Sequence, residues 1–308
     1  CFHNGVFDFN LRLFRKGKPD DYLCKSTKID YVKLTKKDEN TVKEINSFMY
    51  QLFPDPELNN YMWQHLASTL IGDNNDQTFN IYNGSGSNGK SKLIELMSEV
   101  LGDYKETVPS TLITSKRNSI GTTSSEIVAL KGARYAVMQE PTKGDTINEG
   151  IMKEITGGDP LQGRALYKDS ITFIPQFKLV VCTNVLLDVK SNDDGTWRRM
   201  RKVDFLSKFL KQEDLQKSLD EDDSKKDYLF KIDKKLGEKF KTWAQPFMAM
   251  LVEKAIETGG LVNECNAVIA ASLSYRNTQD FFSEFITDKI RKCTGKHIKE
   301  QSLYEVFK

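Results

Sequence analysis

The sequence predicts an α/β fold whose mostly parallel sheet carries a phosphate-binding loop. Two observations support this prediction. Short apolar strands alternate with loops and helices from residue 78 onward, which is typical of a parallel sheet with helical crossovers. The first of these strands is followed by a Gly/Ser-rich loop and then by an amphipathic helix. We therefore expect the ends of the strands to hold the functional site.

Composition agrees with a globular protein and argues against a membrane-spanning one. The chain has 308 residues, enough for about two domains, and 39% of them are hydrophobic and 29% charged. Disordered and collagen-like classes are thereby excluded, and no stretch approaches the ~18 consecutive apolar residues of a membrane span. The net charge of +2 indicates no general affinity for nucleic acid, so a DNA-binding surface would have to be local.

The cysteines and the two ends of the chain carry further expectations. The five cysteines are scattered, odd in number and without a CxxC pair, which favours free thiols in a reducing compartment. Three isolated histidines show no zinc-binding pattern. The chain opens on Cys1 rather than Met and stops at Lys308 within a helix-like pattern, so we expect it to be a fragment of a longer protein.

An amino-terminal region, residues 1–72, is expected to combine short strands with two helices. Residues 1–34 alternate apolar and polar side chains between loop-like turns. A helix is predicted from Thr41, and a second after the prolines, since apolar residues recur there at helical spacing. His65 lies on or beside the apolar face of the second helix, where we expect a packed structural role rather than metal binding.

The α/β core is expected to occupy residues 73–210 and a helical region residues 211–308. Core elements are predicted as strands at 78–83, 133–138 and 177–184 and a helix at 90–101. Beyond residue 209 the chain is densely charged with both signs, which indicates a solvated surface, and two or three helices follow. An aromatic stripe there is expected to pack in a core rather than to stack on bases: Tyr275, Phe281, Phe282, Phe285 and Ile286.

The strongest motif fits GxxxxGK[ST] without a mismatch: Gly84, Ser85, Gly86, Ser87, Asn88, Gly89, Lys90 and Ser91. Glycines let such a loop wind tightly, so that successive backbone N–H groups point at phosphate oxygens, and the helix N-terminus favours the same anion. Lys90 is expected to bridge the outer phosphates of ATP or GTP, and Ser91 to ligate Mg²⁺. The alternative, a chance Gly/Ser-rich turn, is disfavoured by the strand before the loop and the helix after it.

Polar residues that follow later strands and turns are the further candidates. Glu140 follows an apolar strand and would hold Mg²⁺ and activate the attacking water. Asn184 ends another apolar strand and would orient that water or contact the γ-phosphate, with a turn-forming Asn as the alternative. Arg198 and Arg199 would stabilise charge on a transferred phosphoryl group, or else form a plain basic surface.

These motifs, in this order, resemble superfamily 3 helicases, a ring-forming branch of the AAA+ ATPases. The closest resemblance is to the poxvirus-type primase–helicases of large DNA viruses and their phage and plasmid relatives, over roughly residues 3–210. It rests on Asn88 before GKS, Gln139-Glu140-Pro141, the segments Lys153–Asp159 and Arg164–Lys168, the strand ending at Asn184, and Asp194–Arg199. The resemblance implies an ATP hydrolase with an AAA+ P-loop core, preceded by a helical collar-like segment and followed by a helical lid and a partial winged-helix-like region.

The resemblance also implies roles for individual residues. These are binding of ATP and Mg²⁺ by Lys90 and Ser91, metal and water chemistry by Glu140, sensing by Asn184, and a finger into the neighbouring subunit's site from Arg198 or Arg199. Many relatives have two adjacent acidic residues at the strand end, whereas here Gln139 precedes Glu140. One carboxylate then covers both roles, or another acid helps.

Residues 161–173 read as a β-hairpin, because β-forming residues flank a polar Lys-Asp-Ser turn. The resemblance places such a hairpin in the central channel of a ring, with Lys168 on a DNA phosphate and Tyr167 stacked on a base or sugar. Without the resemblance, Lys168 reads as an ordinary exposed turn lysine. Lys116 and Arg117 form a second basic spot, expected at the surface or at a subunit contact.

The leading hypothesis is a hexameric, ATP-driven helicase that moves on single-stranded or forked DNA during viral genome replication. Its implied location is intracellular, in the host cytoplasm, and a primase region would lie elsewhere in the same longer chain. Three alternatives stay open. They are an AAA+ initiator or remodelling ATPase without processive unwinding, a small-molecule P-loop kinase, and a structural DNA-binding subunit with a vestigial site.

Overall fold

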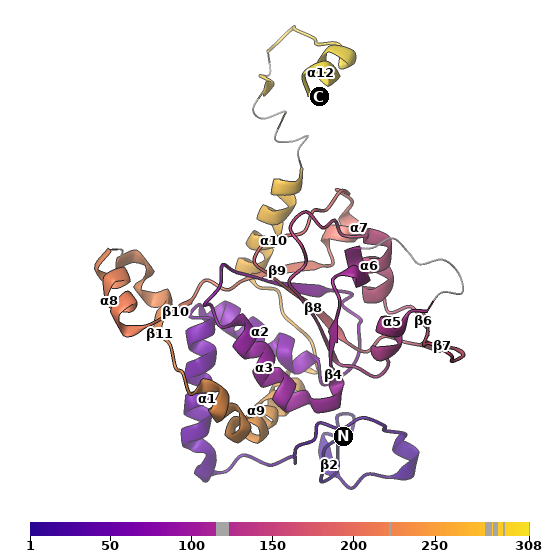
Figure 1. The fold of residues 1–308 in the computed structure, drawn as a ribbon, viewed down its shortest axis with the longest axis vertical. Coiled ribbons are helices and arrows are strands. Elements are labelled where there is room, and N and C mark those ends of the chain that lie inside the picture. The colour runs from indigo at the N-terminus through magenta and orange to yellow at the C-terminus, as the bar shows by residue number, and fades with distance from the viewer. Residues whose placement is uncertain (115–122, 222, 281–284, 286–288, 292, 308) are drawn as a thin grey trace.

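A five-stranded, wholly parallel sheet forms the centre of the chain in the computed structural model (Figure 1). The structure describes residues 1–114, 123–221, 223–280, 285, 289–291 and 293–307. The strands run in the spatial order β4 (Lys105–Val108), β5 (Tyr135–Gln139), β8 (Lys178–Thr183), β3 (Phe79–Asn83) and β9 (Met200–Asp204). The α/β class and the parallel sheet predicted from the sequence are therefore confirmed.

The inner strands are easier to predict from their sequences than the edge strands. β8 is buried along its whole length, and β5 along all but its last residue, as expected for strands that are covered on both faces. The edge strands β4 and β9 carry charged side chains and were not predicted. Their place in the sheet is decided by pairing with β5 and β3, which a local apolar pattern does not reveal.

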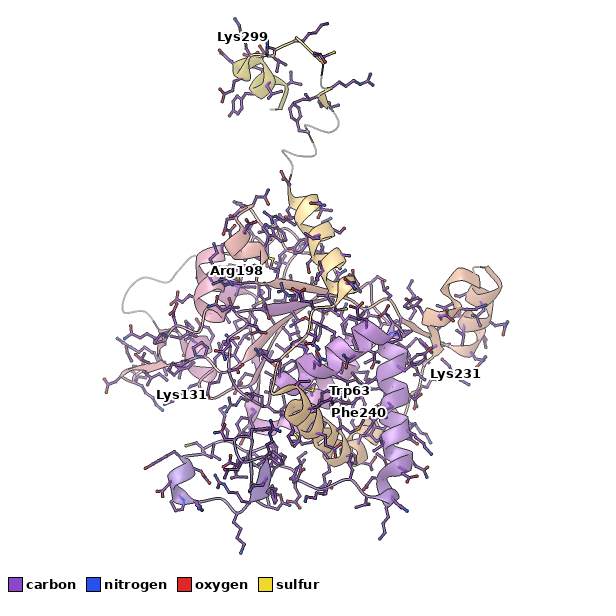
Figure 2. All side chains as sticks on the ribbon, turned by 180° about the vertical axis from the view of Figure 1, so that it is seen from behind. Trp63, Lys131, Arg198, Lys231, Phe240 and Lys299 are labelled. Carbon is purple, nitrogen blue, oxygen red and sulfur yellow. The ribbon has the colours of Figure 1, made fainter. Side chains whose placement is uncertain are left out.

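Helices cover both faces of the sheet, giving three layers. One face packs against α1 (Glu39–Leu52), α2 (Pro56–Ser68), α3 (Lys90–Leu101) and α9 (Leu236–Thr258). Trp63 and Phe240, labelled in Figure 2, belong to this layer. The other face packs against α4 (Thr111–Thr114), α5 (Ser125–Ala129), α6 (Glu149–Thr156), α7 (Asp194–Trp197) and α10 (Asn266–Gln279). Each face of the sheet thus packs against its own apolar core.

Smaller elements surround this core. The amino-terminal segment forms the hairpin β1 (Val6–Asp8) and β2 (Leu13–Arg15), followed by the short 3₁₀ helices η1 (Pro19–Asp21) and η2 (Lys36–Asp38). The predicted hairpin is present as β6 (Leu161–Arg164) and β7 (Ser170–Phe173), with Leu161 opposite Phe173. The charged segment forms β10 (Lys208–Leu210), α8 (Gln212–Glu221), η4 (Asp223–Tyr228) and β11 (Leu229–Lys231), where β10 and β11 pair in parallel. The 3₁₀ turn η3 (Gly102–Tyr104) precedes β4, and α12 (Glu300–Phe307) is the last described element.

The helices predicted from apolar spacing occupy the expected places. α3 has the predicted bounds, and α1 begins two residues before the predicted Thr41. His65 is buried, and its Nδ1 lies 3.1 Å from the side-chain amide nitrogen of Asn80. Burial lowers the pKa of His65 to about 3, so the ring is neutral at physiological pH. The packed structural position expected for this histidine is confirmed.

The aromatic stripe of the carboxyl-terminal region is only partly described. Tyr275 is buried against Trp197, with the two rings 5.2 Å apart, as expected for core packing. Phe281, Phe282 and Ile286 lie outside the described residues, as do Lys116 and Arg117. Among the described helices, none is both long and apolar enough to cross a bilayer. The division into three regions stays a prediction.

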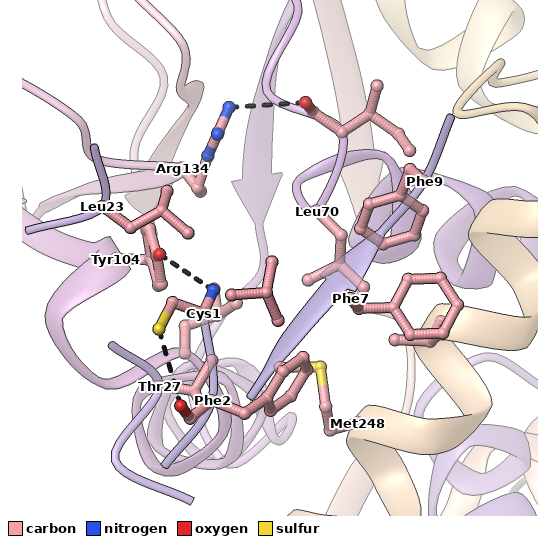
Figure 3. Close-up of a pocket in the computed structure, with 14 residues that line it drawn as sticks. Cys1, Phe2, Phe7, Phe9, Leu23, Thr27, Leu70, Tyr104, Arg134 and Met248 are labelled. Atoms are coloured by element: carbon pink, nitrogen blue, oxygen red, sulfur yellow. Dashed lines mark hydrogen bonds between the residues drawn. The ribbon is translucent and has the colours of Figure 1, made fainter. Parts of the chain in front are cut away.

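A mostly apolar cavity of about 160 Å³ lies beneath the amino-terminal hairpin (Figure 3). Phe7 and Met248 bring the amino-terminal segment and α9 together on its wall, and Arg134 donates from Nη1 to the carbonyl of Ile71 at 3.4 Å. The residues that line it include no carboxylate.

Candidate nucleotide-binding site

The glycine-rich loop links β3 to α3 at the carboxyl edge of the sheet. Gly86, Ser87 and Gly89 all have positive φ, at +92°, +50° and +81°. The positive φ of Gly89 is combined with close packing, because a Cβ at this position would lie 2.2 Å from Cδ2 of Leu52. Leu52 ends α1, so the tight winding of the loop depends on a helix far from it in the sequence.

A cavity of about 320 Å³ opens beside this loop. It is lined by Gly86, Ser87, Asn88, Gly89, Lys90, Ser91, Lys92, Ile94, Gln139, Glu140, Cys182, Thr183 and Asn184. Most of the predicted site residues from β3–α3, the end of β5 and the end of β8 thus meet around one space. Gly84 and Ser85, also predicted, are not among the residues that line it.

Lys90 is held by oxygens of its own chain. Its Nζ donates to the carbonyl of Gly84, to the carbonyl of Thr183 at 3.2 Å and to Oδ1 of Asn184 at 2.9 Å. Burial lowers the pKa of the Lys90 ammonium, while the nearby Glu140 carboxylate acts in the opposite direction. A phosphate that entered the cavity would have to compete with these neutral oxygens for the ammonium, and its negative charge favours it.

Glu140 projects from the turn that follows β5. Its backbone has a positive φ of 48°, and its N–H donates to the carbonyl of Cys182 at 2.9 Å. This bond ties the turn to β8, and the Glu140 side chain stays exposed on the cavity wall. Glu140 is the one carboxylate among the residues that line the cavity.

Asn184 and Cys182, both from β8 or the turn that follows it, also line the cavity. Asn184 is exposed at the end of β8, where its amide oxygen accepts the hydrogen bond from Lys90. Cys182 is buried, and burial raises the pKa of its thiol to about 12. The Cys182 sulfur is therefore protonated at neutral pH and is a poor nucleophile.

The loop contains one buried polar group without a partner. Asn88 is 4% exposed, and its Nδ2 has no hydrogen-bond acceptor among the described residues. The same side chain accepts weakly from the backbone N–H of Lys90, at 3.4 Å.

The hydroxyl of Ser91 and the carboxylate of Glu140 are hard oxygen donors of the type that Mg²⁺ prefers. The donor set of the cavity thus fits a nucleotide with its metal.

Arg198 and Arg199 lie at the amino edge of the sheet, where the parallel strands begin, opposite the carboxyl edge, where the strands end and the cavity lies. β9 runs parallel to β3, with Met200 opposite Phe79 and Asp204 opposite Asn83. The two arginines come just before the amino end of β9, whereas the glycine-rich loop follows the carboxyl end of β3. The strand that separates the two edges has five residues, which span about 16 Å. The structure therefore does not bring either arginine into the cavity of its own chain.

Gln77 is a partner of both arginines that sequence reasoning missed. Its Oε1 accepts from Nη2 of Arg198 at 2.8 Å and from Nη2 of Arg199 at 3.0 Å. Gln77 belongs to a polar loop before β3, and nothing in that loop distinguishes it from neighbouring Asn and Asp residues. A second missed contact joins β10 to the glycine-rich loop, where the N–H of Phe209 donates to the carbonyl of Ser87 at 2.7 Å.

The tip of the β6–β7 hairpin presents the two predicted DNA-binding residues. Tyr167 is 94% exposed with a φ of 59°, and Lys168 is exposed beside it. The N–H of Lys168 donates to the carbonyl of Ala165 at 3.1 Å, which closes the turn. Neither residue lines the nucleotide cavity, so the hairpin is a separate surface of the chain.

Comparison with known proteins gives both sequence and fold relatives. Residues 82–199 match the model of a family described as a family of unknown function (DUF5906). The chain is 39% identical to "Putative helicase L207/L206" of Acanthamoeba polyphaga mimivirus, covering 99% of this chain and 32% of the relative. It is 33% identical to "Putative helicase 184R" of Invertebrate iridescent virus 6, over 78% of this chain and 25% of the relative. It is also 26% identical to "Putative primase C962R" of African swine fever virus, over 76% and 25%.

The chain thus spans about a quarter to a third of the length of these relatives. Among solved structures, the C-terminal region of NrS-1 superimposes with a TM-score of 0.53 at 11% identity. That match covers 91% of this chain and 64% of the other. At this identity the likeness shows a shared fold.

Proposed function

This chain is homologous to part of the proteins named as helicases and primases in large DNA viruses, and from that premise we propose that it is the ATP-hydrolysing motor of a superfamily 3 (AAA+) helicase. Such a motor would assemble as a ring, with six subunits as the expected number, and would move along single-stranded DNA during viral genome replication.

The observation that carries the proposal is the division of groups between the two edges of the sheet. Lys90, Glu140 and Asn184 surround one cavity at the carboxyl edge. The arginines lie at the amino edge, about 16 Å away along the strands. None of the described residues that line the cavity is an arginine, and the chain presents two arginines at the opposite edge, so such a site would be completed when two copies of the chain meet, one edge against the other.

Within the cavity, each side chain has a distinct task in hydrolysis. Lys90 would exchange its three protein oxygens for phosphate oxygens, which are stronger acceptors because they are charged. The Glu140 carboxylate would take the proton of the attacking water. Asn184, released by Lys90, would orient that water or the γ-phosphate. Mg²⁺, held by Ser91 and Glu140, would neutralise charge on the phosphates when bound.

DNA would contact the β6–β7 hairpin. The exposed Lys168 ammonium suits a phosphate, and the exposed Tyr167 ring suits a base or sugar. Every nucleotide has a phosphate, a sugar and a base face, so contacts of these two kinds should show little sequence preference. Because the net charge of the chain is only +2, the affinity would rest on local groups of this kind.

Two measurements on the purified chain test the proposal. The rate of ATP hydrolysis per subunit should rise with protein concentration and with added single-stranded DNA, because the site is shared between subunits. Forked DNA should be separated into its strands when ATP and Mg²⁺ are present. Hydrolysis without strand separation would favour the remodelling ATPase, and a rate per subunit that is independent of concentration and DNA would exclude the shared site.

Replacing the hairpin lysine should weaken DNA binding through charge. Lys168→Ala should lower the affinity for single-stranded DNA and reduce the slope of log affinity against log salt by ~0.7. Lys231→Ala is the matched control, since Lys231 is an exposed lysine on β11, remote from the hairpin in Figure 2. Fluorescence anisotropy at several salt concentrations measures both quantities. Equal slopes for Lys168→Ala and the unsubstituted chain would remove Lys168 from the DNA contact.

A further inference from the structure

The two adjacent arginines have very different surroundings. Arg199 is only 9% exposed, whereas Arg198 is exposed. Nη1 of Arg199 donates to the carbonyl of Gly195, and its Nη2 donates to Gln77 at 3.0 Å. The guanidinium of Arg198 donates from Nη2 to Oε1 of Gln77 at 2.8 Å. One guanidinium is thus built into the protein, and the other lies at its surface (Figure 2).

Gln77 is oriented by three hydrogen bonds at once. Its Nε2 donates to the carbonyl of Gly157 at 3.0 Å, just beyond α6. With the nitrogen committed to that carbonyl, the oxygen must face the arginines, where its two lone pairs accept one donor from each. The amide therefore links the arginines to the segment after α6 in one defined geometry.

The residues around Arg198 are anchored on both sides. Trp197 precedes it and is buried, with its Nε1 donating to the carbonyl of Ser191 at 3.0 Å. Arg199 follows it, and the carbonyl of Arg199 accepts from the N–H of Phe79 at 2.9 Å. Arg198 is thus an exposed side chain on an anchored backbone, an arrangement suited to presenting a group accurately to a neighbour.

We propose that Arg198 is the residue that enters the neighbouring subunit's nucleotide site, and that Arg199 and Gln77 are the positioning residues that hold it there. This inference rests on the proposed function. On entering the site, Arg198 exchanges the neutral Gln77 oxygen for a phosphate oxygen, which is the stronger acceptor. Arg199 stays, because leaving would remove a hydrogen-bond donor from the Gly195 carbonyl and from the Gln77 oxygen, both of which belong to half-buried residues.

Single substitutions should separate the two roles. Arg198→Ala should lower kcat for ATP by ~10³-fold, as expected for loss of a finger, and leave the Tm unchanged. Arg199→Ala and Gln77→Ala should lower kcat by ~10–100-fold through misplacement, and Arg199→Ala should also lower the Tm by ~3 °C. Asn75→Ala is the control in the same loop, since Asn75 is exposed and bonds only to neighbouring Asp73 among the described residues.

Combining the substitutions tests whether the positioning residues act through Arg198. In an Arg198→Ala background, adding Gln77→Ala or Arg199→Ala should leave kcat unchanged, because no guanidinium remains to be positioned. A merely structural role would lower kcat in both backgrounds by the same factor. Mixing Arg198→Ala with Lys90→Ala subunits should restore hydrolysis, because each supplies what the other lacks.

Two results would overturn the assignment. One is a ~10³-fold loss in Arg199→Ala beside near-normal hydrolysis in Arg198→Ala, which would exchange the roles. The other is a multiplicative loss in the double variants, which would make Gln77 and Arg199 structural only. Failure of the proposed function is seen earlier and separately, as an unsubstituted chain whose hydrolysis per subunit does not depend on protein concentration.

Discussion

Lys90→Ala should abolish ATP hydrolysis, with a loss of at least ~10²–10³-fold in kcat. The Lys90 ammonium bonds to Gly84, Thr183 and Asn184, whereas Lys92, the other lysine that lines the cavity, is paired with Glu95 at 2.7 Å. ATP at 100 times its dissociation constant should stabilise the unsubstituted chain by about 2.7 kcal/mol, and this stabilisation should vanish in the variant. Thermal unfolding with and without ATP and Mg²⁺ measures it.

The control for this substitution is Lys131→Ala. Lys131 is an exposed lysine in the turn after α5 and does not line the cavity (Figure 2). It should hydrolyse ATP and respond to nucleotide as the unsubstituted chain does. A Lys90→Ala chain that is still stabilised by ATP and still hydrolyses it would show that the cavity beside the glycine-rich loop is not the nucleotide site.

Glu140→Gln should lower kcat by ~10²–10⁴-fold while ATP still binds. The amide keeps the shape of the side chain but accepts no proton from water, so chemistry is lost and binding is retained. The Glu140 side chain is exposed on the cavity wall, where its carboxylate can accept a proton. Single-turnover hydrolysis and thermal stabilisation by ATP distinguish the two effects.

Asp204 is the matched acid for this experiment. It ends β9 at the same edge of the sheet, but its carboxylate is already bonded to Lys202 at 2.7 Å and to Nδ2 of Asn83 at 2.7 Å. Asp204→Asn should therefore hydrolyse ATP at a rate close to that of the unsubstituted chain. If Asp204→Asn were as damaged as Glu140→Gln, a second acid would share the role, as in relatives with two adjacent acids.

The elements that the sequence predicted well are those whose own residues contain the signal. A run of apolar residues bounded by turns indicates a buried strand, and this held for β5 and β8. The glycine-rich motif and the apolar spacing that follows it placed α3 within its observed bounds. The hairpin at residues 161–173 was visible for the same reason, because both strands and their turn are contiguous.

What the sequence by itself determined about this protein is the α/β class, the strand–loop–helix of the nucleotide cavity and the hairpin, since the signal for each element lies in a contiguous stretch of chain. The tertiary structure alone decided that charged β4 and β9 join the sheet, because long-range pairing overrides a weak local pattern. It also decided that Arg199 is buried and Arg198 exposed. Both guanidinium groups donate to the Gln77 amide, 121 and 122 residues away along the chain, and no local pattern encodes a contact of that range.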